Sequence, residues 1–310
     1  MTPFDPAAGA DSTLKKFSIN PIQWLATSDG WINPALAPPV DEQLRIVAEA
    51  GFTSVKSVVP TGSNVTEYGQ KLADHGLVPG PGYVALPWHE DASGRLPFLD
   101  RASALASDNV QLGTPLVFLS MGMSQDAPRV RHPAEGHSHA LDRLERVRDY
   151  IALAAGRISA EGCVAALHPH VGTWVETADE ARFVLDTVDE ELLKFGPDSG
   201  HLAWTGVNPA EVIAEYAPRV AGLHIKDLKM EIARQARIAR LDYRSTVLQG
   251  LWTEPGRGDA DLLELLAAPG PEFDGWVVVE VDRATTSPEE SIRYCGEWLT
   301  RMLHSGRKGE

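Results

Sequence analysis

Polar and ionisable side chains follow four consecutive apolar runs in the second half of the chain. In chain order they are His168 and His170, Asp198 and His201, His224, Lys226 and Asp227, and Glu280 and Asp282. Imidazoles and carboxylates from separate strands can surround one cation, and a mixed set of nitrogen and oxygen ligands suits Mn²⁺, Co²⁺, Fe²⁺, Mg²⁺ or Zn²⁺. The pattern therefore predicts a site for one divalent metal ion, with no thiolate among its ligands.

Three of these residues directly follow or close apolar runs and are the leading candidates for metal ligands. Asp198 stands in GPDSGH, His224 stands in LHIKD, and Glu280 closes WVVVE. A polar group at such a position is costly unless it binds a ligand or makes a hydrogen bond. His168, in the sequence His-Pro-His, is the fourth candidate ligand, with orientation of a loop or service as a base as its alternatives.

Eight short apolar runs alternate with helical stretches and must position these residues. The runs cover residues 17–24, 53–59, 78–86, 115–121, 163–170, 193–200, 220–227 and 276–282. Unbroken apolar runs suit strands buried on both faces, and alternation with helices implies parallel pairing through right-handed crossovers. Eight such units close a single (β/α)₈ TIM barrel of the α/β class, whose functional groups gather at the carboxyl ends of the strands. We expect this catalytic barrel over residues 17–305, between an N-terminal extension (1–16) and a C-terminal tail (306–310).

Helix signals stand between the apolar runs. Pairs of residues typical of helix starts are Thr177 with Glu180, Ser287 with Glu290, and Asn208 with Pro209. Gly51 and Gly76 are expected to end two further helices. Two long connections, over residues 87–97 and 122–137, leave the face of the barrel where enzymes of this architecture keep their sites.

The composition excludes several classes of partner. The chain of 310 residues carries 43 acidic and 28 basic residues, and its formal net charge of −15 would repel a phosphate backbone. Cys163 and Cys295 lie far apart, so neither a disulfide framework nor a thiolate zinc site is expected. No apolar run reaches the length of a membrane span, and the N-terminus lacks the pattern of an export signal. We therefore expect a soluble cytoplasmic protein that binds neither nucleic acid nor membrane.

An ordered set of short motifs runs through the chain. The motifs are NPIQW near the start, HPHVGTWVET, DSGHLAWTG, HIKDLK, GLWTEPGRGDADL and GWVVVEVD. In this order they resemble the sugar phosphate isomerase/epimerase superfamily of xylose isomerase-like barrels, and within it most closely the inosose dehydratase group. The resemblance runs from about Ser18 to the last predicted helix and is strongest in the C-terminal half.

This resemblance implies roles for individual residues. Family ligands fall on Asp198, His224 and Glu280, while the remaining ligand, often a glutamate, falls on His168. The family also often carries a glutamate in the second strand, where this chain has Lys56. A lysine at that position favours a different orientation of the substrate, or an anionic intermediate.

Other polar side chains near the predicted strand ends suit catalysis or substrate binding. His201, on the turn after the sixth run, is placed to bond to a substrate hydroxyl or carbonyl beside the metal. Lys226 lies two residues after His224, so both side chains point to the same side of the strand. Its ammonium would stabilise an enolate or assist a leaving hydroxyl, with a salt bridge to Asp227 or a neighbouring carboxylate as the alternative. Arg257 in PGRGD is a candidate for binding a substrate oxygen.

Tryptophans also gather near predicted strand ends and loops. They are Trp24, Trp88, Trp174, Trp204 and Trp252. Aromatic faces suit the C–H faces of sugars and flat aglycones, so Trp24 and Trp204 are candidates for substrate binding, with core packing as the alternative for each.

The leading functional hypothesis is a divalent-metal-dependent lyase. Proton abstraction next to the ketone of a keto-sugar or keto-polyol would be followed by loss of a β-oxygen or β-carbon group, as in inosose dehydration or in cleavage of a 3-oxo-glycoside, C-glycosides included. The ion, Mn²⁺ by preference, would hold the charge of the developing enolate. His168 or His170 is the preferred base, since imidazole titrates near neutrality. Which of the two ligates the metal stays open.

Three alternatives to elimination remain. Reprotonation of the same enolate would make the protein a metal-dependent sugar isomerase or epimerase acting on a ketose. Phosphodiester hydrolysis occurs on this barrel in DNA-repair endonucleases, but it needs a basic face that this acidic chain lacks. A non-catalytic barrel that binds sugars, or serves as one subunit of a complex, is the third. The expected assembly is a homo-oligomer, or a hetero-oligomer with a small second subunit.

Overall fold

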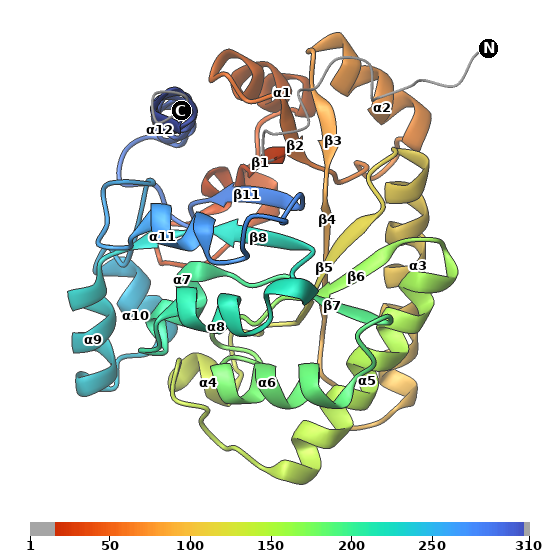
Figure 1. Cartoon of the computed structure of the whole chain (residues 1–310), viewed down its shortest axis with the longest axis vertical. Coiled ribbons are helices and arrows are strands. Elements are labelled where there is room, and N and C mark those ends of the chain that lie inside the picture. Colours follow the sequence, from red (N-terminus) through yellow and green to blue (C-terminus); the bar gives the residue numbers. More distant parts are fainter. Residues whose placement is uncertain (1–15, 307–310) are drawn as a thin grey trace.

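The computed structural model describes residues 16–306. The extension expected over residues 1–16 and the tail expected over 306–310 lie outside this part, apart from Lys16 and Gly306, which begin the first strand and end the last helix. Parallel strands form a barrel at the centre of the molecule, with helices around it (Figure 1).

The strands of the barrel follow the predicted order. They are β1 (Lys16–Asn20), β2 (Ser54–Lys56), β3 (Val78–Gly80), β4 (Gly82–Leu86), β5 (Leu116–Met121), β6 (Val164–Leu167), β7 (Leu193–Phe195), β8 (Gly222–Ile225) and β11 (Trp276–Glu280). One parallel sheet has the order β3-β2-β1-β11-β8, and the other has the order β4-β5-β6-β7. Each of the eight predicted runs contributes to the barrel, which confirms the TIM-barrel prediction.

The two sheets join at two seams. At the first, the predicted third run is divided at Pro81, so that β3 pairs with β2 while β4 pairs with β5. Proline has no backbone N–H to donate to a sheet, so the run is interrupted and forms two short strands, each paired with a different neighbouring strand. At the second seam, parallel bridges from Phe195 to Val220 and from Asp198 to His224 link the end of β7 to β8. The latter bridge places two candidate metal ligands side by side.

The predicted run over residues 193–200 is a strand only as far as Phe195. The next helix, α7 (Ser199–Trp204), begins with Asp198 as its N-cap. Oδ1 of Asp198 accepts a hydrogen bond from the backbone N–H of His201 at 2.9 Å, which satisfies one of the free donors of the helix. His201 therefore lies in a helix, not on a turn as predicted, and Oδ2 of Asp198 is left for the site.

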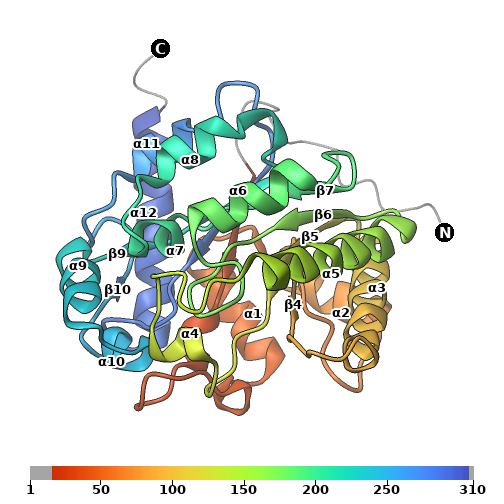
Figure 2. The same ribbon diagram turned by 90° about the horizontal axis from the view of Figure 1, so that it is seen from below.

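Helices surround the barrel on its outside (Figures 1 and 2). The main ones are α1 (Val40–Glu49), α2 (Val65–Asp74), α3 (Leu96–Gln111), α5 (Leu141–Ala160), α6 (Ala178–Thr187), α8 (Pro209–Glu215), α11 (Leu262–Ala267) and α12 (Pro288–Gly306). Within residues 16–306, no helix combines the length and apolarity that crossing a bilayer requires.

Additional short elements lie at the carboxyl ends of the strands. They are α4 (Pro128–Arg131), α9 (Met230–Ala239), α10 (Tyr243–Leu248) and an antiparallel hairpin of β9 (Asp227–Leu228) with β10 (Trp252–Thr253). Figure 2 shows α9, α10 and this hairpin together at one side of the barrel. The hairpin was not predicted, because two-residue strands carry too short a pattern to be recognised.

The predicted helix signals are confirmed. The pairs Thr177–Glu180, Asn208–Pro209 and Ser287–Glu290 stand at the starts of α6, α8 and α12. Gly51 and Gly76 follow α1 and α2 with positive φ angles of 92° and 70°, which a glycine adopts without strain.

Phe118 on β5 fills the barrel interior beneath the site. Its ring centroid lies 4.4 Å from that of His224 and 5.8 Å from that of His168. A Cβ on Gly196 or Gly222 would stand only 2.6 or 2.7 Å from atoms of the phenyl ring. The two glycines therefore make room for Phe118, which supports both histidines and closes the site toward the opposite end of the barrel.

Arg129 in α4 fastens the long connection after β5 to the connection after β6. Its guanidinium donates to both oxygens of Glu180, at 2.7 and 2.5 Å, and Nη1 also donates to the carbonyl of Thr173 at 3.0 Å. Nε donates to the carbonyl of His137 at 3.0 Å. Because the side chains of Arg129, Glu176 and Glu180 are all buried, this cluster is an internal charge network that holds two loops over the barrel mouth.

We expect Arg129→Met to lower the free energy of unfolding by about 3–5 kcal/mol, because Glu176 and Glu180 would remain buried without their countercharge. Denaturant titration of the purified variants measures this loss. Arg234→Met is the matched control: Arg234 pairs with Glu231 on the exposed face of α9, where a surface pair contributes less than about 1 kcal/mol. Equal losses in the two variants would contradict the role of the buried network.

Candidate active site

Lys226, just after β8, lies at the centre of the polar cluster at the barrel mouth. Its side chain is fully buried, and Nζ lies 2.8 Å from Glu280 Oε1, 2.8 Å from Asp282 Oδ1 and 3.2 Å from Asp198 Oδ2. Nε2 of His201 lies 3.2 Å from the same nitrogen. Residues from the ends of three strands and from α7 therefore meet at one ammonium group.

The carboxylates around this ammonium determine its charge. Burial by itself lowers the pKa of Lys226, but Asp198, Asp282 and Glu280 together raise it well above its usual value. Burial acts to raise the pKa of Glu280, yet Lys226 and His224 hold that pKa well below its usual range. Burial raises the pKa of Asp282 to about 7. The cluster thus combines a permanent cation with one carboxyl group that exchanges its proton near neutral pH.

A metal ion fits the group formed by His168, Asp198 and His224, whose potential ligand atoms lie within 4.8 Å of one another. Nδ1–H of His168 donates to the carbonyl of Gly196 at 3.1 Å, so Nε2 carries the lone pair, 3.7 Å from Asp198 Oδ2. Burial keeps the pKa of His168 well below its usual value, so the ring is neutral at pH 7. Beyond its ion pair with Lys226, the buried Oδ2 accepts no hydrogen bond from residues 16–306. Two facing lone pairs with no proton between them suit a cation, and the backbone carbonyl orients the imidazole as metal sites require.

Glu280, the remaining predicted ligand, contacts this group without joining it. Oε2 accepts a hydrogen bond from the side-chain amide of Asn20 at 2.6 Å and lies 2.9 Å from His224 Nδ1. A carboxylate beside Nδ1 keeps the proton there and leaves the lone pair of His224 on Nε2. In this arrangement Glu280 orients His224, and direct ligation by Glu280 remains a prediction.

A second group of ligand-type atoms within 4.8 Å of one another comes from His170, His201 and Asp282. The ring centroids of the two histidines are 3.6 Å apart. Nδ1–H of His170 donates to the carbonyl of Val171 at 2.8 Å, and burial lowers the pKa of His170 to about 4. Its Nε2 therefore carries a lone pair at neutral pH, whereas Nε2 of His201 faces the Lys226 ammonium.

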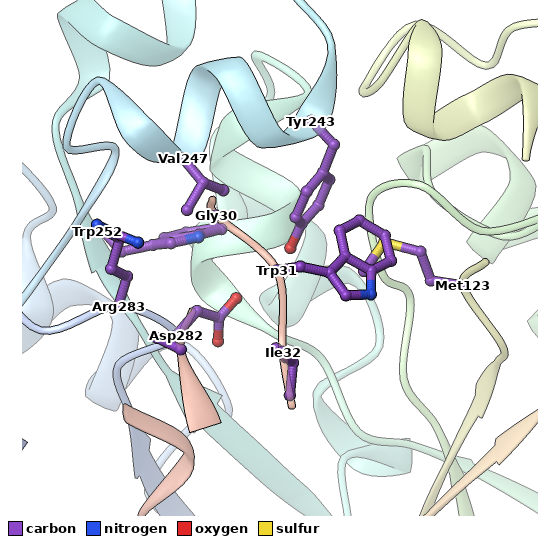
Figure 3. Close-up of a pocket in the computed structure, with 10 residues that line it drawn as sticks. Gly30, Trp31, Ile32, Met123, Tyr243, Val247, Trp252, Asp282 and Arg283 are labelled. Carbon is purple, nitrogen blue, oxygen red and sulfur yellow. The ribbon is translucent and has the colours of Figure 1, made fainter. Parts of the chain in front are cut away.

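A cavity of about 180 Å³ opens beside Asp282 (Figure 3). Its lining comes from the β1–α1 connection, the connection after β5, α10, the β10 strand and the connection after β11. The side chains most prominent in it are Trp31, Met123, Tyr243, Val247, Trp252 and Asp282. An open, largely aromatic space thus adjoins the histidines, carboxylates and lysine of the barrel mouth.

A family model described as xylose isomerase-like TIM barrel matches residues 44–302. The chain belongs to this family. Membership agrees with the closed barrel and with the position of the polar cluster at the carboxyl ends of the strands.

Two curated relatives illustrate what the sequence is similar to. The chain is 31% identical over 163 residues to an inosose dehydratase of Geobacillus kaustophilus strain HTA426, a match that covers 52% of this chain and 53% of that protein. It therefore spans about half of that relative's length. It is 30% identical over 295 residues to the rhizopine catabolism protein MocC of Rhizobium meliloti, covering 90% of this chain and 85% of that protein.

Solved structures share the fold at low sequence identity. The IolI protein, solved with a zinc atom, aligns with a TM-score of 0.66 at 18% identity over 94% of this chain and 98% of its own. The 3-keto-D-glucoside 4-epimerase YcjR from E. coli aligns with a TM-score of 0.68 at 17% identity over 93% and 100%. These solved structures therefore share the barrel fold of this family member.

The structure brings most of the predicted site residues of this barrel together. Besides the two groups described above, Lys56 lies near the cluster: its Nζ stands 5.0 Å from the centroid of the Tyr83 ring. Burial lowers the pKa of Lys56, and the charge of Glu280 opposes that shift. Lys56 is therefore a second amine at the barrel mouth, at the end of β2.

Three other predicted substrate contacts lie elsewhere. Trp24 packs in the core near α12, where its Nε1 donates to Glu289 at 3.0 Å. Trp204 is fully buried behind Trp252, with ring centroids 5.7 Å apart, so it supports the cavity wall from outside. Arg257 lies over the Tyr294 ring, 3.8 Å from its centroid, and does not line the cavity.

The Gly-rich motif around Arg257 has a structural task. The backbone N–H groups of Gly256 and Gly258 each donate to Asp227 Oδ2 at 2.8 Å. A Cβ on Gly258 would lie 1.9 Å from Asp227 Oδ1, so only glycine permits this approach. Asp227 thus anchors the loop and does not pair with Lys226. The other form of the alternative, a salt bridge of Lys226 with neighbouring carboxylates, is present in the structure.

Some residues of the site carry little signal in the sequence. Asn20, which bonds to Glu280, ends strand β1 and belongs to the same pattern of polar strand ends. Trp31 and Tyr243 line the cavity but stand in a loop and a short helix whose placement depends on the tertiary fold. Met123 stands in one of the two connections that the sequence marks as unusually long.

Proposed function

We propose that the protein is a divalent-metal-dependent lyase that removes a β-substituent from a keto-sugar or keto-polyol through an enolate. The likeness to inosose dehydratases favours an inosose-like ketone, and the same chemistry serves a 3-oxo-glycoside, C-glycosides included. One observation carries this proposal. The buried cluster holds an imidazole with a free nitrogen, which can act as a base, and separately a charged group that can assist the leaving substituent.

The residues that would hold the ion are His168, Asp198 and His224, with Glu280 as the fourth. Mn²⁺ is our preferred ion, because neutral imidazoles combined with carboxylates suit it and no thiolate is present. When bound, the ion supplies a positive charge for the oxygen of the developing enolate.

His170 is the residue that we assign as the base. His168 has its free nitrogen directed toward Asp198, and His201 has its Nε2 opposite the Lys226 ammonium. His170 alone of these three has an Nε2 lone pair that neither group engages, and the Val171 carbonyl fixes its tautomer. His170 lies beside His201 and Asp282, and its ring centroid is 6.5 Å from that of Tyr243 in the cavity wall.

Lys226 and Asp282 are the groups that we assign to the leaving side of the reaction. The Lys226 ammonium is fully buried, so its charge acts strongly on a departing oxygen. Asp282, with its pKa near 7, donates a proton that the leaving group takes up. Epimerisation needs only exchange at the carbon, whereas elimination needs this additional donor, and so the arrangement favours a lyase.

Product analysis tests the proposal. We expect the Mn²⁺-loaded protein to convert a 2-keto-inositol or a 3-oxo-glucoside into an unsaturated or leaving-group-free ketone that product NMR identifies. Deuterium at the acidic carbon should slow the reaction when C–H cleavage limits the rate. A product of unchanged mass would reject elimination and establish the isomerase or epimerase alternative.

A further inference from the structure

We propose that the cavity beside Asp282 binds the aryl aglycone of the substrate, so that the preferred substrate is a 3-oxo-glycoside carrying a flat aromatic group. This inference rests on the proposed function, because it places the two ends of one substrate in the metal cluster and in the adjoining cavity.

The walls of the cavity are aromatic and apolar on several sides. Trp31 and Tyr243 approach each other edge to face, with ring centroids 6.2 Å apart, and Val247 and Trp252 continue the surface. Figure 3 shows the rings of Trp31, Tyr243 and Trp252 arranged around one open space, with the side chain of Met123 behind Trp31. Flat aromatic groups gain most from such surroundings, through edge-to-face and offset contacts with the rings and through sulfur–aromatic contact.

The same walls suit a polyol poorly. The side chains of the lining residues carry few polar groups: the carboxylate of Asp282, the hydroxyl of Tyr243, the guanidinium of Arg283, and the indole N–H groups of Trp31 and Trp252. Arg283 is already bound, since its Nη1 donates to the carbonyl of Thr27 at 2.7 Å. A sugar ring placed here would lose hydrogen bonds to water that the cavity does not replace, whereas an aryl ring has none to lose.

The size of the space agrees with one aromatic ring. The cavity measures about 180 Å³. An apolar protein cavity of roughly 150 Å³ is known to hold a benzene molecule. One aryl ring with a small substituent therefore fits, and a second fused ring would extend toward solvent through the open side.

Trp252 connects the cavity to the reacting groups. Its ring lies 5.1 Å from Lys226 Nζ and 5.2 Å from the ring centroid of His201, while the indole also lines the cavity. Gly200 permits this approach, because a Cβ there would stand 2.8 Å from Trp252 and 2.9 Å from Lys226. A group leaving next to Lys226 and Asp282 would therefore already lie against the aromatic wall.

The wall that carries Trp31 is held in place from two sides. Residues Ala26 and Ile32 form an antiparallel bridge that closes a small loop. Arg244 of α10 donates to the carbonyl and the carboxylate of Asp29 in this loop, at 2.9 and 2.7 Å. Since Arg283 binds the same loop, the cavity is preformed and a bound ring would not have to order it.

Binding of unreactive glycosides tests the inference without turnover. Phenyl β-D-glucopyranoside and methyl β-D-glucopyranoside both lack the ketone, so neither can eliminate. We expect calorimetry on the Mn²⁺-loaded protein to show at least about tenfold tighter binding of the phenyl glucoside, equal to about 1.4 kcal/mol. Equal affinities would overturn the inference, because they would mean that the sugar alone is recognised.

Substitutions locate the binding at this cavity. Trp31→Ala should weaken phenyl glucoside about tenfold and leave methyl glucoside unchanged, and Val247→Phe, which fills the space, should do the same. Trp88→Ala is the control, because Trp88 stacks with Arg95 on another loop and does not line the cavity. Unchanged phenyl binding in both cavity variants would also overturn the inference. Selective phenyl binding without turnover of any 3-oxo-glycoside would reject the proposed lyase while retaining the aryl site.

Discussion

Asp198→Asn is expected to abolish the retention of a divalent metal ion and to lower kcat/KM by on the order of a thousandfold. Oδ2 of Asp198 is the buried acceptor that faces His168, and an amide in its place offers no negative charge to a cation. The amide oxygen can still accept the hydrogen bond that Oδ1 receives from His201, so α7 keeps its cap and the barrel should stay folded. Elemental analysis after dialysis measures the metal, and steady-state kinetics measures the loss.

The control for this variant is Asp261→Asn. Asp261 caps α11 by accepting the N–H of Glu264 at 3.0 Å and does not belong to either group of candidate ligands. Its variant should retain metal and activity. Glu280→Gln separates two roles: loss of metal would establish Glu280 as a ligand, and retention with lower activity would show that it orients His224. Full occupancy and activity in both Asp198→Asn and Glu280→Gln would refute the metal site.

Lys226→Met is expected to reduce kcat by about 10²- to 10⁴-fold, because the leaving group would lose its charged partner. We also expect a loss of about 3–5 kcal/mol in the free energy of unfolding of the chelated protein at pH 8. Methionine retains much of the buried stem but leaves Asp198, Glu280 and Asp282 without their shared cation. Denaturant titrations at pH 8 and pH 5 measure both the loss and its pH dependence.

The stability difference between this variant and the natural protein should narrow at pH 5. In the natural protein Lys226 holds the pKa of Glu280 low, so this contribution to stability is still complete at pH 5, above the unfolded pKa, and the narrowing comes from the variant. In the variant the Lys226 charge no longer opposes the effect of burial on Glu280 and Asp282, so protonation of these two carboxyl groups stabilises the folded state as the pH falls from 8 to 5. Lys194→Met is the control, since Lys194 pairs with Glu191 at the surface and should cost less than about 1 kcal/mol. A difference that is constant from pH 8 to pH 5 would contradict the shared ion-pair network.

Local patterns in the sequence predict the strands and helix starts of this barrel. Eight apolar runs identify the strands because parallel strands buried on both faces need continuous apolar residues. The pairs Thr177–Glu180 and Ser287–Glu290 mark helix starts because a cap acts within one turn. The same locality explains why His168, Asp198, His224 and Glu280 are recognisable, since each lies within the last residues of the strand that positions it or just after them.

Contacts that depend on barrel closure are not visible in the sequence. Asn20 and Glu280 are 260 positions apart, and they meet because β1 pairs with β11. Lys226 forms ion pairs with Asp198, Glu280 and Asp282 and not with its neighbour Asp227. The carboxylate of Asp227 instead accepts hydrogen bonds from backbone N–H groups of its own loop.

The sequence by itself determined the strands, the helix starts and the polar residues at the barrel mouth, because short-range periodicity and capping decide these features. Only the tertiary structure decided which nitrogen of His168 is free, because folding brings the backbone carbonyl of Gly196 close enough to bind the other one. It also decided the aromatic cavity, since Trp31 and Tyr243 come from segments that meet only when the chain closes around its barrel. The sequence gives the type of each side chain, whereas the hydrogen-bond partner of each buried polar group depends on the whole fold.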